Sequence, residues 1–196
     1  APLDVAATEA ALREALDDGY PAVAIAFLHA YVNPEHERQA AAIARDVGFA
    51  QVTPSHAASP LVKIVARGDT AVVDAYLSPV LRGHVERVAD ALDLGRAVER
   101  LQFMQSSGGL TDAGMFQGKD AILSGPAGGI VGMARTGEEA GFDRLIGFDM
   151  GGTSTDVSHY AGRYDRSFET EVAGVRLRAP MMDIHTVAAG GGSICT

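Results

Sequence analysis

Two aspartates flank a short segment of glycines and hydroxyl residues. Asp149 ends an apolar run, and Asp156 follows the segment Gly151, Gly152, Thr153, Ser154 and Thr155. Glycines let a phosphate approach the backbone, so that several N–H groups can converge on one oxygen, and the hydroxyls add donors. The two carboxylates are candidate catalytic groups and candidate Mg²⁺ ligands, directly or through water. The alternative is a tight hairpin turn capped by Asp149.

Two further glycine-rich segments could bind an anion. The first contains Gly125, Gly128 and Gly129 at the start of a predicted helix, where unpaired N–H groups attract anions. Its alternative role is close packing of that helix on a sheet. The second contains Gly190, Gly191 and Gly192, which permit either close approach of a ligand or a hinge.

Other catalytic patterns are missing from the sequence. It has no Gly-x4-Gly-Lys-Ser/Thr loop, no Gly-x-Gly-x-x-Gly fingerprint and no Gly-x-Ser-x-Gly elbow. The six histidines lack the spacing of metal ligands, and His185, just before the triple glycine, is the one best placed for a role. Cys195 is expected to be a small buried residue rather than a nucleophile.

The elements that must position these segments follow from periodicity and turn residues. A helix over 4–18, a buried strand over 22–28, a helix from Asn33 to about Val47 and a short strand over 50–53 predict parallel strands and an α/β fold. A helix over 67–92 should kink or divide at Pro79. A strand over 101–105 comes next, followed by a helix that starts after Pro126 and runs to Ala140. The strand over 145–150 delivers Asp149, and segments 156–160, 164–172 and 175–179 predict an antiparallel meander.

Composition limits the classes of function. The 196 residues carry a formal net charge of −9, which argues against a nucleic-acid surface, so an anionic ligand must be held by N–H groups and a cation. There is no apolar run long enough to span a membrane and no secretory signal. One cysteine excludes an internal disulfide and favours a reducing compartment, the cytoplasm. The chain lacks an initiator Met and stops within a glycine-rich segment, as an internal fragment would.

The order of these segments resembles the hydantoinase A/oxoprolinase family. The resemblance rests on residues 124–129, 147–158 and 183–193, with support from 29–37, 67–77 and 105–110. It implies an α/β fold of the actin-like ATPase (ribonuclease H-like) type, a mixed sheet with flanking helices. Residues 1–62 would end an N-terminal actin-like domain, and 63–196 would begin the hydantoinase A/oxoprolinase domain with its phosphate loop, so that the fragment spans parts of two domains.

The resemblance also implies cofactors, a reaction and partners. ATP and Mg²⁺ would bind between two domains, with Asp149 through Asp156 as the second phosphate loop. The implied reaction opens a five-membered cyclic amide or imide, 5-oxoproline or hydantoin, after ATP phosphorylates the carbonyl oxygen. A companion hydantoinase B-type subunit or domain and oligomeric assembly are expected, and the isolated fragment is expected to be inactive. Two alternatives stay open: an ATP-dependent ketone carboxylase subunit, and a nucleotide-switched scaffold without its own chemistry.

Overall fold

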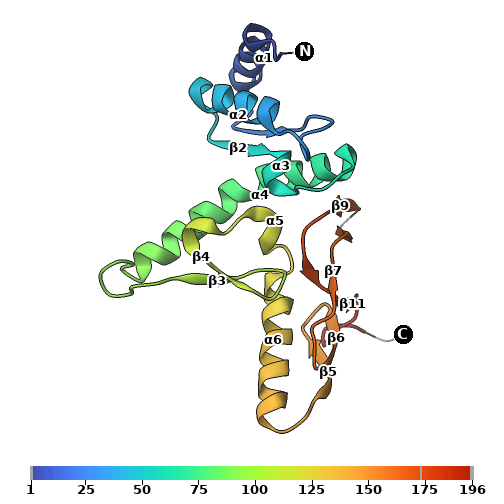
Figure 1. Ribbon diagram of the computed structural model, residues 1–196. Helices are drawn as coiled ribbons and strands as arrows, with labels where there is room; N and C mark the ends of the chain where they lie inside the picture. The colour runs from blue at the N-terminus through green and yellow to red at the C-terminus, as the bar shows by residue number, and fades with distance from the viewer. Residues whose placement is uncertain (1, 173, 195–196) are drawn as a thin grey trace. The chain divides into compact units, whose positions relative to one another are not determined.

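The structure is a computed structural model that describes residues 2–172 and 174–194, shown from blue to red in Figure 1. The chain forms two compact units. The first comprises Ala1–Arg100, Gln117–Lys119 and Glu169–Ala179; the second comprises Leu101–Phe116, Asp120–Phe168 and Pro180–Thr196. The domain boundary predicted after residue 62 stays a prediction.

The first unit contains a parallel strand pair packed against helices. Its elements are α1 (Val5–Asp17), β1 (Ala22–Ile25), α2 (Glu35–Val47), β2 (Gln51–Pro54), α3 (Ser55–Ala58), α4 (Ile64–Ala91), β8 (Thr170–Val172) and β9 (Val175–Leu177). The predicted parallel pair is confirmed, because β1 and β2 are parallel and α2 connects them. The strand predicted over 22–28 is shorter and ends at Ile25. Helices α2 and α4 both contact this strand pair, and α1 packs on α2.

Local residue chemistry sets the ends of these helices. Asp4 caps α1 by accepting the Ala7 N–H at 3.0 Å, and Gly48, with φ +117°, ends α2 in the left-handed region. Of the two outcomes predicted at Pro79, a kink or a division, the division is wrong, because α4 is one helix of 28 residues; the kink stays a prediction. Proline removes one N–H donor, and the buried side chains of Ala71 and Ala75 before it hold α4 in place by packing.

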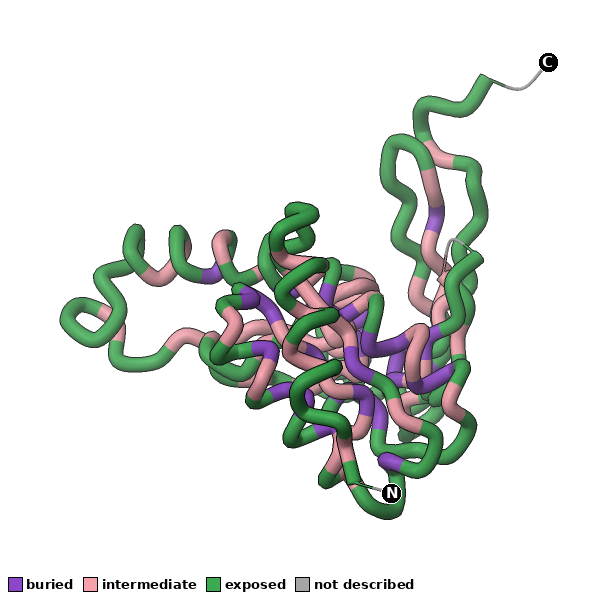
Figure 2. The backbone as a smooth tube through the Cα atoms, turned by 90° about the horizontal axis from the view of Figure 1, so that it is seen from above, coloured by how far each residue is buried: buried purple, intermediate pink, exposed green. Residues whose placement is uncertain are grey.

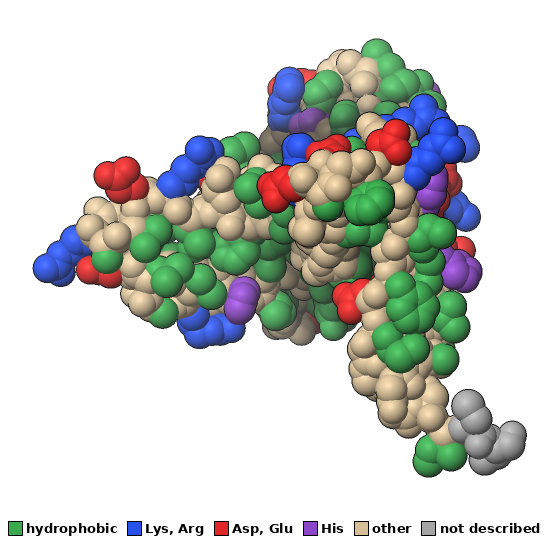
Figure 3. All heavy atoms as spheres, turned by 90° about the horizontal axis from the view of Figure 1, so that it is seen from below, with side chains coloured by type: hydrophobic (Ala, Val, Ile, Leu, Met, Phe, Trp, Pro, Cys, Tyr) green, Lys and Arg blue, Asp and Glu red, His purple; other side chains and the backbone are tan. Residues whose placement is uncertain are grey.

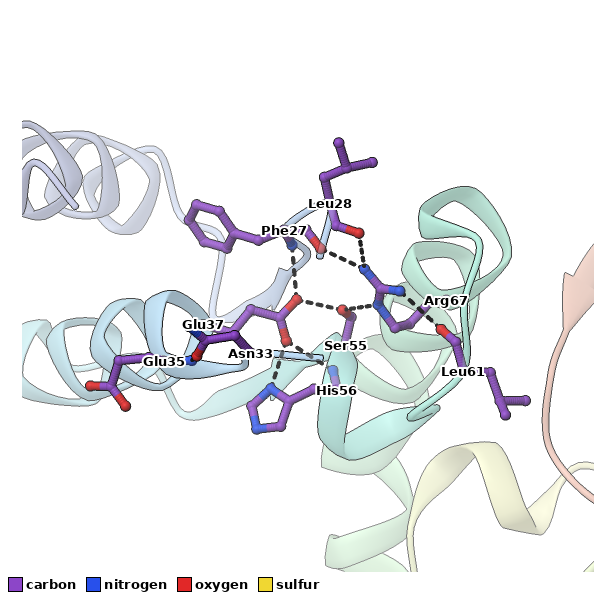
Figure 4. A network of polar contacts seen from close by, with 9 residues as sticks. All are labelled: Phe27, Leu28, Asn33, Glu35, Glu37, Ser55, His56, Leu61 and Arg67. Atoms are coloured by element: carbon purple, nitrogen blue, oxygen red, sulfur yellow. Dashed lines mark hydrogen bonds and ion pairs between the residues drawn. The ribbon is translucent and has the colours of Figure 1, made fainter. Parts of the chain in front are cut away.

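A buried polar network joins four segments of the first unit, and Figure 4 shows it from close by. The Glu37 carboxylate accepts hydrogen bonds from the Phe27 N–H, the Ser55 hydroxyl, and the backbone and ring nitrogens of His56. Arg67 donates to Ser55 Oγ at 2.8 Å and to the carbonyls of Phe27, Leu28 and Leu61. Glu37 and Arg67 are both 0% exposed, so their charges depend on these partners.

Replacing Glu37 with Gln is expected to open this network. The NH₂ group of the Gln side chain would face hydrogen-bond donors that now bind a carboxylate oxygen. Because two donors cannot bond to each other, we expect a loss of about 2 kcal/mol in local stability. The measurement is hydrogen exchange of the Phe27 and His56 amides in the full-length protein. Glu35→Gln is the matched control, because Glu35 lies exposed on the same helix. Equal exchange in the two variants would contradict the role given to Glu37.

The effect of Glu37→Gln should depend on pH. Burial raises the pKa of Glu37, but the hydrogen bonds from Ser55, His56 and Phe27 outweigh burial and lower that pKa below its ordinary value of 4.5. A carboxyl group with a lowered folded-state pKa stabilises the fold above its ordinary pKa, and this contribution is lost as pH falls through the folded-state value. The exchange difference between wild type and variant should therefore be full above pH 4.5 and shrink on acidification.

The second unit contains a three-stranded antiparallel sheet and a long helix. Its elements are β3 (Gln102–Met104), β4 (Leu110–Asp112), a 3-10 turn (Ala113–Met115), α6 (Ser124–Glu139), β5 (Arg144–Met150), β6 (Thr155–Ala161), β7 (Arg166–Ser167), β10 (Met181–Met182) and β11 (His185–Val187); α5 (Gly118–Ala121) begins in the first unit. The sheet order is β11-β6-β5. The meander prediction is confirmed in part: the antiparallel pairing of 164–172 with 175–179 exists as β8 with β9, but segment 164–172 divides into β7 and β8, and β7 pairs with β10 instead of with its neighbours.

Helix α6 packs on β5 and β6 at very short range, and Figure 1 shows them side by side. A Cβ at Gly137 would lie 2.3 Å from Leu145 Cδ1, and one at Gly147 would lie 2.7 Å from Met133 Sδ. The Tyr160 hydroxyl donates to Glu138 across the same interface. The face of the sheet that carries Gly147 and Asp149 is therefore the face that α6 covers.

Candidate functional site

The loop between β5 and β6 is a hairpin turn with its glycines at the tip. The Gly151 N–H donates to the Ser154 carbonyl at 2.9 Å and closes the turn. Strands β5 and β6 pair in register from Arg144 opposite Ala161 to Met150 opposite Thr155. The hairpin part of the alternative is therefore correct, and it does not exclude a binding role; the cap by Asp149 stays a prediction.

The triple-glycine segment packs directly on this turn. The Gly191 N–H donates to the Gly151 carbonyl at 2.9 Å, and the Gly192 N–H donates to the Gly152 carbonyl at 2.8 Å. A Cβ at Gly190 would lie 2.5 Å from the Gly151 carbonyl oxygen, closer than real Cβ contacts. The glycines thus allow two loops to meet backbone against backbone. Most of the chain in this part is exposed, as Figure 2 shows.

This pairing also orients the peptide N–H groups of the turn. The peptides are trans, so each N–H points away from the carbonyl of the same peptide. Because the Gly151 and Gly152 carbonyls point at the triple-glycine loop, the N–H groups of Gly152 and Thr153 point to the opposite side. Successive N–H groups that point to one side of a turn can bind an anion together. This geometry is suited to a phosphate oxygen.

Asp149 and Asp156 lie directly opposite each other on β5 and β6 and line the same cavity, of about 360 Å³. Thr186, the partner of Asp156 on β11, donates its hydroxyl to Asp156 Oδ1 at 2.7 Å. The rest of the lining comes from α6, β5, β6 and the approach to β11: Pro126, Gly129, Ile130, Met133, Ile146, Gly147, Phe148, Ser158 and Ile184.

The paired carboxylates fit a cation held together with a phosphate. Opposed residues of antiparallel strands have Cβ atoms about 5 Å apart, and like charges at that distance repel. A cation between them would remove this cost. Among the described residues no cluster of three or more His, Cys, Asp or Glu could hold a metal ion. Mg²⁺ commonly uses one or two carboxylates and completes its shell with water and phosphate oxygens, so two are sufficient.

The predicted site residues are brought together to different degrees. The turn, the triple glycine and the two aspartates all lie at one end of the β11-β6-β5 sheet. Of the α6 glycines, Gly129 lines the cavity. A Cβ added at Gly128 would lie 3.7 Å from Met104 Cγ, and a Cβ added at Gly125 would have no neighbour within 4 Å. The ligand roles of these residues stay predictions.

Sequence reasoning missed Thr186 and Ser158, and it left His185 open. Thr186 and Ser158 are on the α6 side by strand alternation, a pattern that could have identified them once the register was known. His185 lines a separate cavity of about 270 Å³ with His159, Asp165 and Asp183. Cys195 lies outside the described residues.

Surface charge and helix length give two further observations. On the face drawn in Figure 3, acidic and basic side chains are interspersed among exposed hydrophobic ones. Within the described residues, none of the helices combines the length and the apolar character needed to cross a bilayer.

Two family models match the chain. The model described as Hydantoinase/oxoprolinase matches residues 67–196, and the one described as Hydantoinase/oxoprolinase N-terminal region matches residues 1–48. Among characterised proteins, the 5-oxoprolinase of Saccharomyces cerevisiae is 46% identical over 97% of the chain, and 5-oxoprolinase 1 of Arabidopsis thaliana is 45% identical over 98%. The chain spans 15% of the length of each.

Two solved structures share the fold. The ATP-dependent caprolactamase of Pseudomonas jessenii has a TM-score of 0.86 and 35% identity, covering 99% of this chain and 29% of that one. A nucleotide-free acetone carboxylase has a TM-score of 0.83 and 26% identity, covering 96% of this chain and 28% of that one. The predicted α/β fold of the actin-like ATPase type is confirmed by this likeness.

Proposed function

Because the chain belongs to the hydantoinase/oxoprolinase family, we propose that the full-length protein uses ATP to open a five-membered cyclic amide or imide, 5-oxoproline or hydantoin. The single observation that carries this proposal is the glycine turn. Its outward N–H groups and the opposed aspartates Asp149 and Asp156 meet at one end of a sheet. The names of the relatives support the substrate class. The geometry of the turn and of the paired aspartates supports binding of phosphate and a cation there.

The chemistry follows from the stability of a lactam. Amide resonance makes its carbonyl carbon a poor electrophile, and transfer of the γ-phosphoryl group to the carbonyl oxygen removes that resonance. Water then adds to the carbon, the ring C–N bond breaks with a proton going to nitrogen, and a second water releases phosphate from the acyl phosphate. Overall, the lactam, ATP and two water molecules are converted into the amino acid, ADP and inorganic phosphate.

The residues of this chain would position charge rather than form covalent bonds. The N–H groups of Gly152 and Thr153 and the hydroxyl of Ser154 would hold phosphate oxygens. Asp149 and Asp156 would hold Mg²⁺, directly or through water, which neutralises charge on the phosphates when bound. A chain with a net charge of −9 needs that cation to hold a polyphosphate.

Partners and location belong to the same proposal. The relative named caprolactamase subunit alpha, 37% identical over 98% of the chain, has a name that implies a further subunit, which supports a hydantoinase B-type companion here. We propose assembly with that companion into an oligomer. The cytoplasm is the proposed compartment, because it supplies ATP.

Ketone carboxylation is the second candidate, and the likeness to acetone carboxylase favours it. Both candidates are tested by phosphate release from ATP by the full-length protein with its companion, in the presence of 5-oxoproline, hydantoin or acetone with bicarbonate. Stimulation by 5-oxoproline or hydantoin, with ring opening seen by mass spectrometry, supports the proposal. Stimulation by acetone only when bicarbonate is present would overturn it in favour of the carboxylase.

Replacing Thr186 with Val should slow this turnover about tenfold. The substitution keeps the shape of the side chain but removes the hydrogen bond that fixes Asp156 Oδ1. The bond is exposed, so the loss lies at the low end for a bond to a charged group, about 1.5 kcal/mol. Thr186→Ser, which keeps the hydroxyl, is the control and should stay near wild type. The measurement is kcat under saturating ATP; equal rates for the Val and Ser variants would show that the hydroxyl does not orient Asp156.

A further inference from the structure

Ser106 is fully buried, two residues after the end of β3, and uses both its backbone and its side chain in hydrogen bonds within the second unit. Its hydroxyl donates to the Asp120 carbonyl at 2.8 Å and accepts from the Leu123 N–H at 2.9 Å. Its backbone N–H also donates to the Asp120 carbonyl, and its own carbonyl accepts from the Met182 N–H, both at 2.7 Å. Four polar contacts therefore converge on one residue that is 0% exposed.

The first pair of contacts fixes the start of α6. Leu123 is the N-cap of this helix, and its own side chain makes no capping bond. The hydroxyl of Ser106, which belongs to a different segment, accepts the Leu123 N–H instead. One turn further along lies Pro126, followed by Gly129, Ile130 and Met133, the α6 residues that line the cavity beside Asp149. These α6 residues form one wall of the cavity, here called the α6 wall. Because a helix moves as a rigid body, the position of its N-cap residue, Leu123, determines the position of the α6 wall.

The contact with Met182 fixes the opposite approach to the site. Met182 ends β10, and two residues later Ile184 lines the same cavity. The next strand, β11, carries Thr186, which bonds Asp156. The neighbouring Gly108, with φ +80°, lets the loop approach Met182 so closely that a Cβ there would lie 2.1 Å from Met182 Cε.

We propose that Ser106 is a positioning residue for the nucleotide and cation site, joining the α6 wall of the cavity to the segment that leads to β11. This rests on the proposed function, because it assumes that MgATP binds beside Asp149 and Asp156. Loss of the hydroxyl leaves the part-buried Leu123 N–H without its acceptor, and the helix start must then shift toward another partner.

The test is titration calorimetry of MgATP into the full-length protein and its Ser106→Ala variant, with kcat and KM for ATP measured alongside. Ser106→Ala should raise Kd and KM for ATP about tenfold, since the Leu123 N–H loses its acceptor and the start of α6 shifts. The neighbouring Ser107→Ala is the matched control, because the Ser107 hydroxyl makes one long contact, 3.4 Å from the Gly109 nitrogen. It should bind ATP like wild type, and Ser106→Thr, which restores a hydroxyl, should recover part of the affinity.

Three outcomes separate the claims. Unchanged ATP affinity in Ser106→Ala, together with faster hydrogen exchange at the Leu123 amide, would overturn the positioning role while leaving the proposed function intact. Equal losses in Ser106→Ala and Ser107→Ala would also overturn it, because they would reflect general destabilisation. Failure of wild type to bind MgATP would overturn the proposed function itself, before any variant is compared.

Discussion

Asp149→Asn in the full-length protein is expected to reduce substrate-dependent ATP hydrolysis about a thousandfold, because charge stabilisation through a metal ion is worth several kcal/mol in the transition state. The amide keeps the size of the side chain and removes the charge that would hold the cation. Asp149 lies opposite Asp156, so the remaining carboxylate could hold a cation only weakly. The measurement is phosphate release with 5-oxoproline or hydantoin at saturating ATP and Mg²⁺.

Asp143→Asn is the matched control for that substitution. Asp143 is exposed just before β5 begins, so the same change of charge is made near the far end of the same strand. It should leave turnover within about twofold of wild type, as exposed substitutions away from special features usually do. Wild-type turnover in Asp149→Asn would contradict the assignment of this carboxylate to the site.

Gly190→Ala is expected to weaken ATP binding about tenfold or more. Its new methyl group would lie 2.5 Å from the Gly151 carbonyl oxygen and 2.8 Å from the Thr153 nitrogen, so the two loops must separate. Forcing extra atoms into a packed contact costs about 1–3 kcal/mol. Separation would break the hydrogen bonds to the Gly151 and Gly152 carbonyls. The N–H groups of Gly152 and Thr153 would then no longer be held in their present orientation. Titration calorimetry with MgATP gives the affinity.

Gly191→Ala provides an unusually close control for this effect. A Cβ at Gly191 would meet its nearest atom, the Gly151 carbonyl oxygen, at 3.8 Å, an ordinary contact. Gly191→Ala should therefore bind ATP nearly as wild type does, although it changes the adjacent residue of the same loop. Equal affinities in the two variants would mean that backbone packing between the loops does not shape the phosphate site.

Local patterns predicted much of this fold. The βαβ unit followed from an apolar run, a capped helix and a second strand, and the ends of α2 and α6 followed from Gly48 and Gly141. The pairing of β7 did not follow, because this short strand pairs with β10, a partner that lies farther along the chain and is chosen by tertiary contacts, whereas β8 pairs with the next strand, β9.

The candidate site was only partly predictable. The aspartates and glycines are residue types typical of phosphate and metal sites, so their segments could be identified directly from the sequence. The packing of Gly190 on Gly151, and the hydrogen bonds of Thr186 and Ser106, join residues far apart in the sequence and leave no periodic trace. Backbone contacts of this kind become visible only when the register of the sheet is known.

The most direct test of the account is an experimental structure of the full-length protein with Mg²⁺ and a non-hydrolysable ATP analogue. We expect γ-phosphate oxygens within hydrogen-bonding distance of the Gly152 and Thr153 nitrogens, and Mg²⁺ bound to Asp149 or Asp156 directly or through one water. The triple-glycine loop should stay paired with the turn. Phosphates bound elsewhere, with the turn and both aspartates facing only solvent, would contradict the central claim.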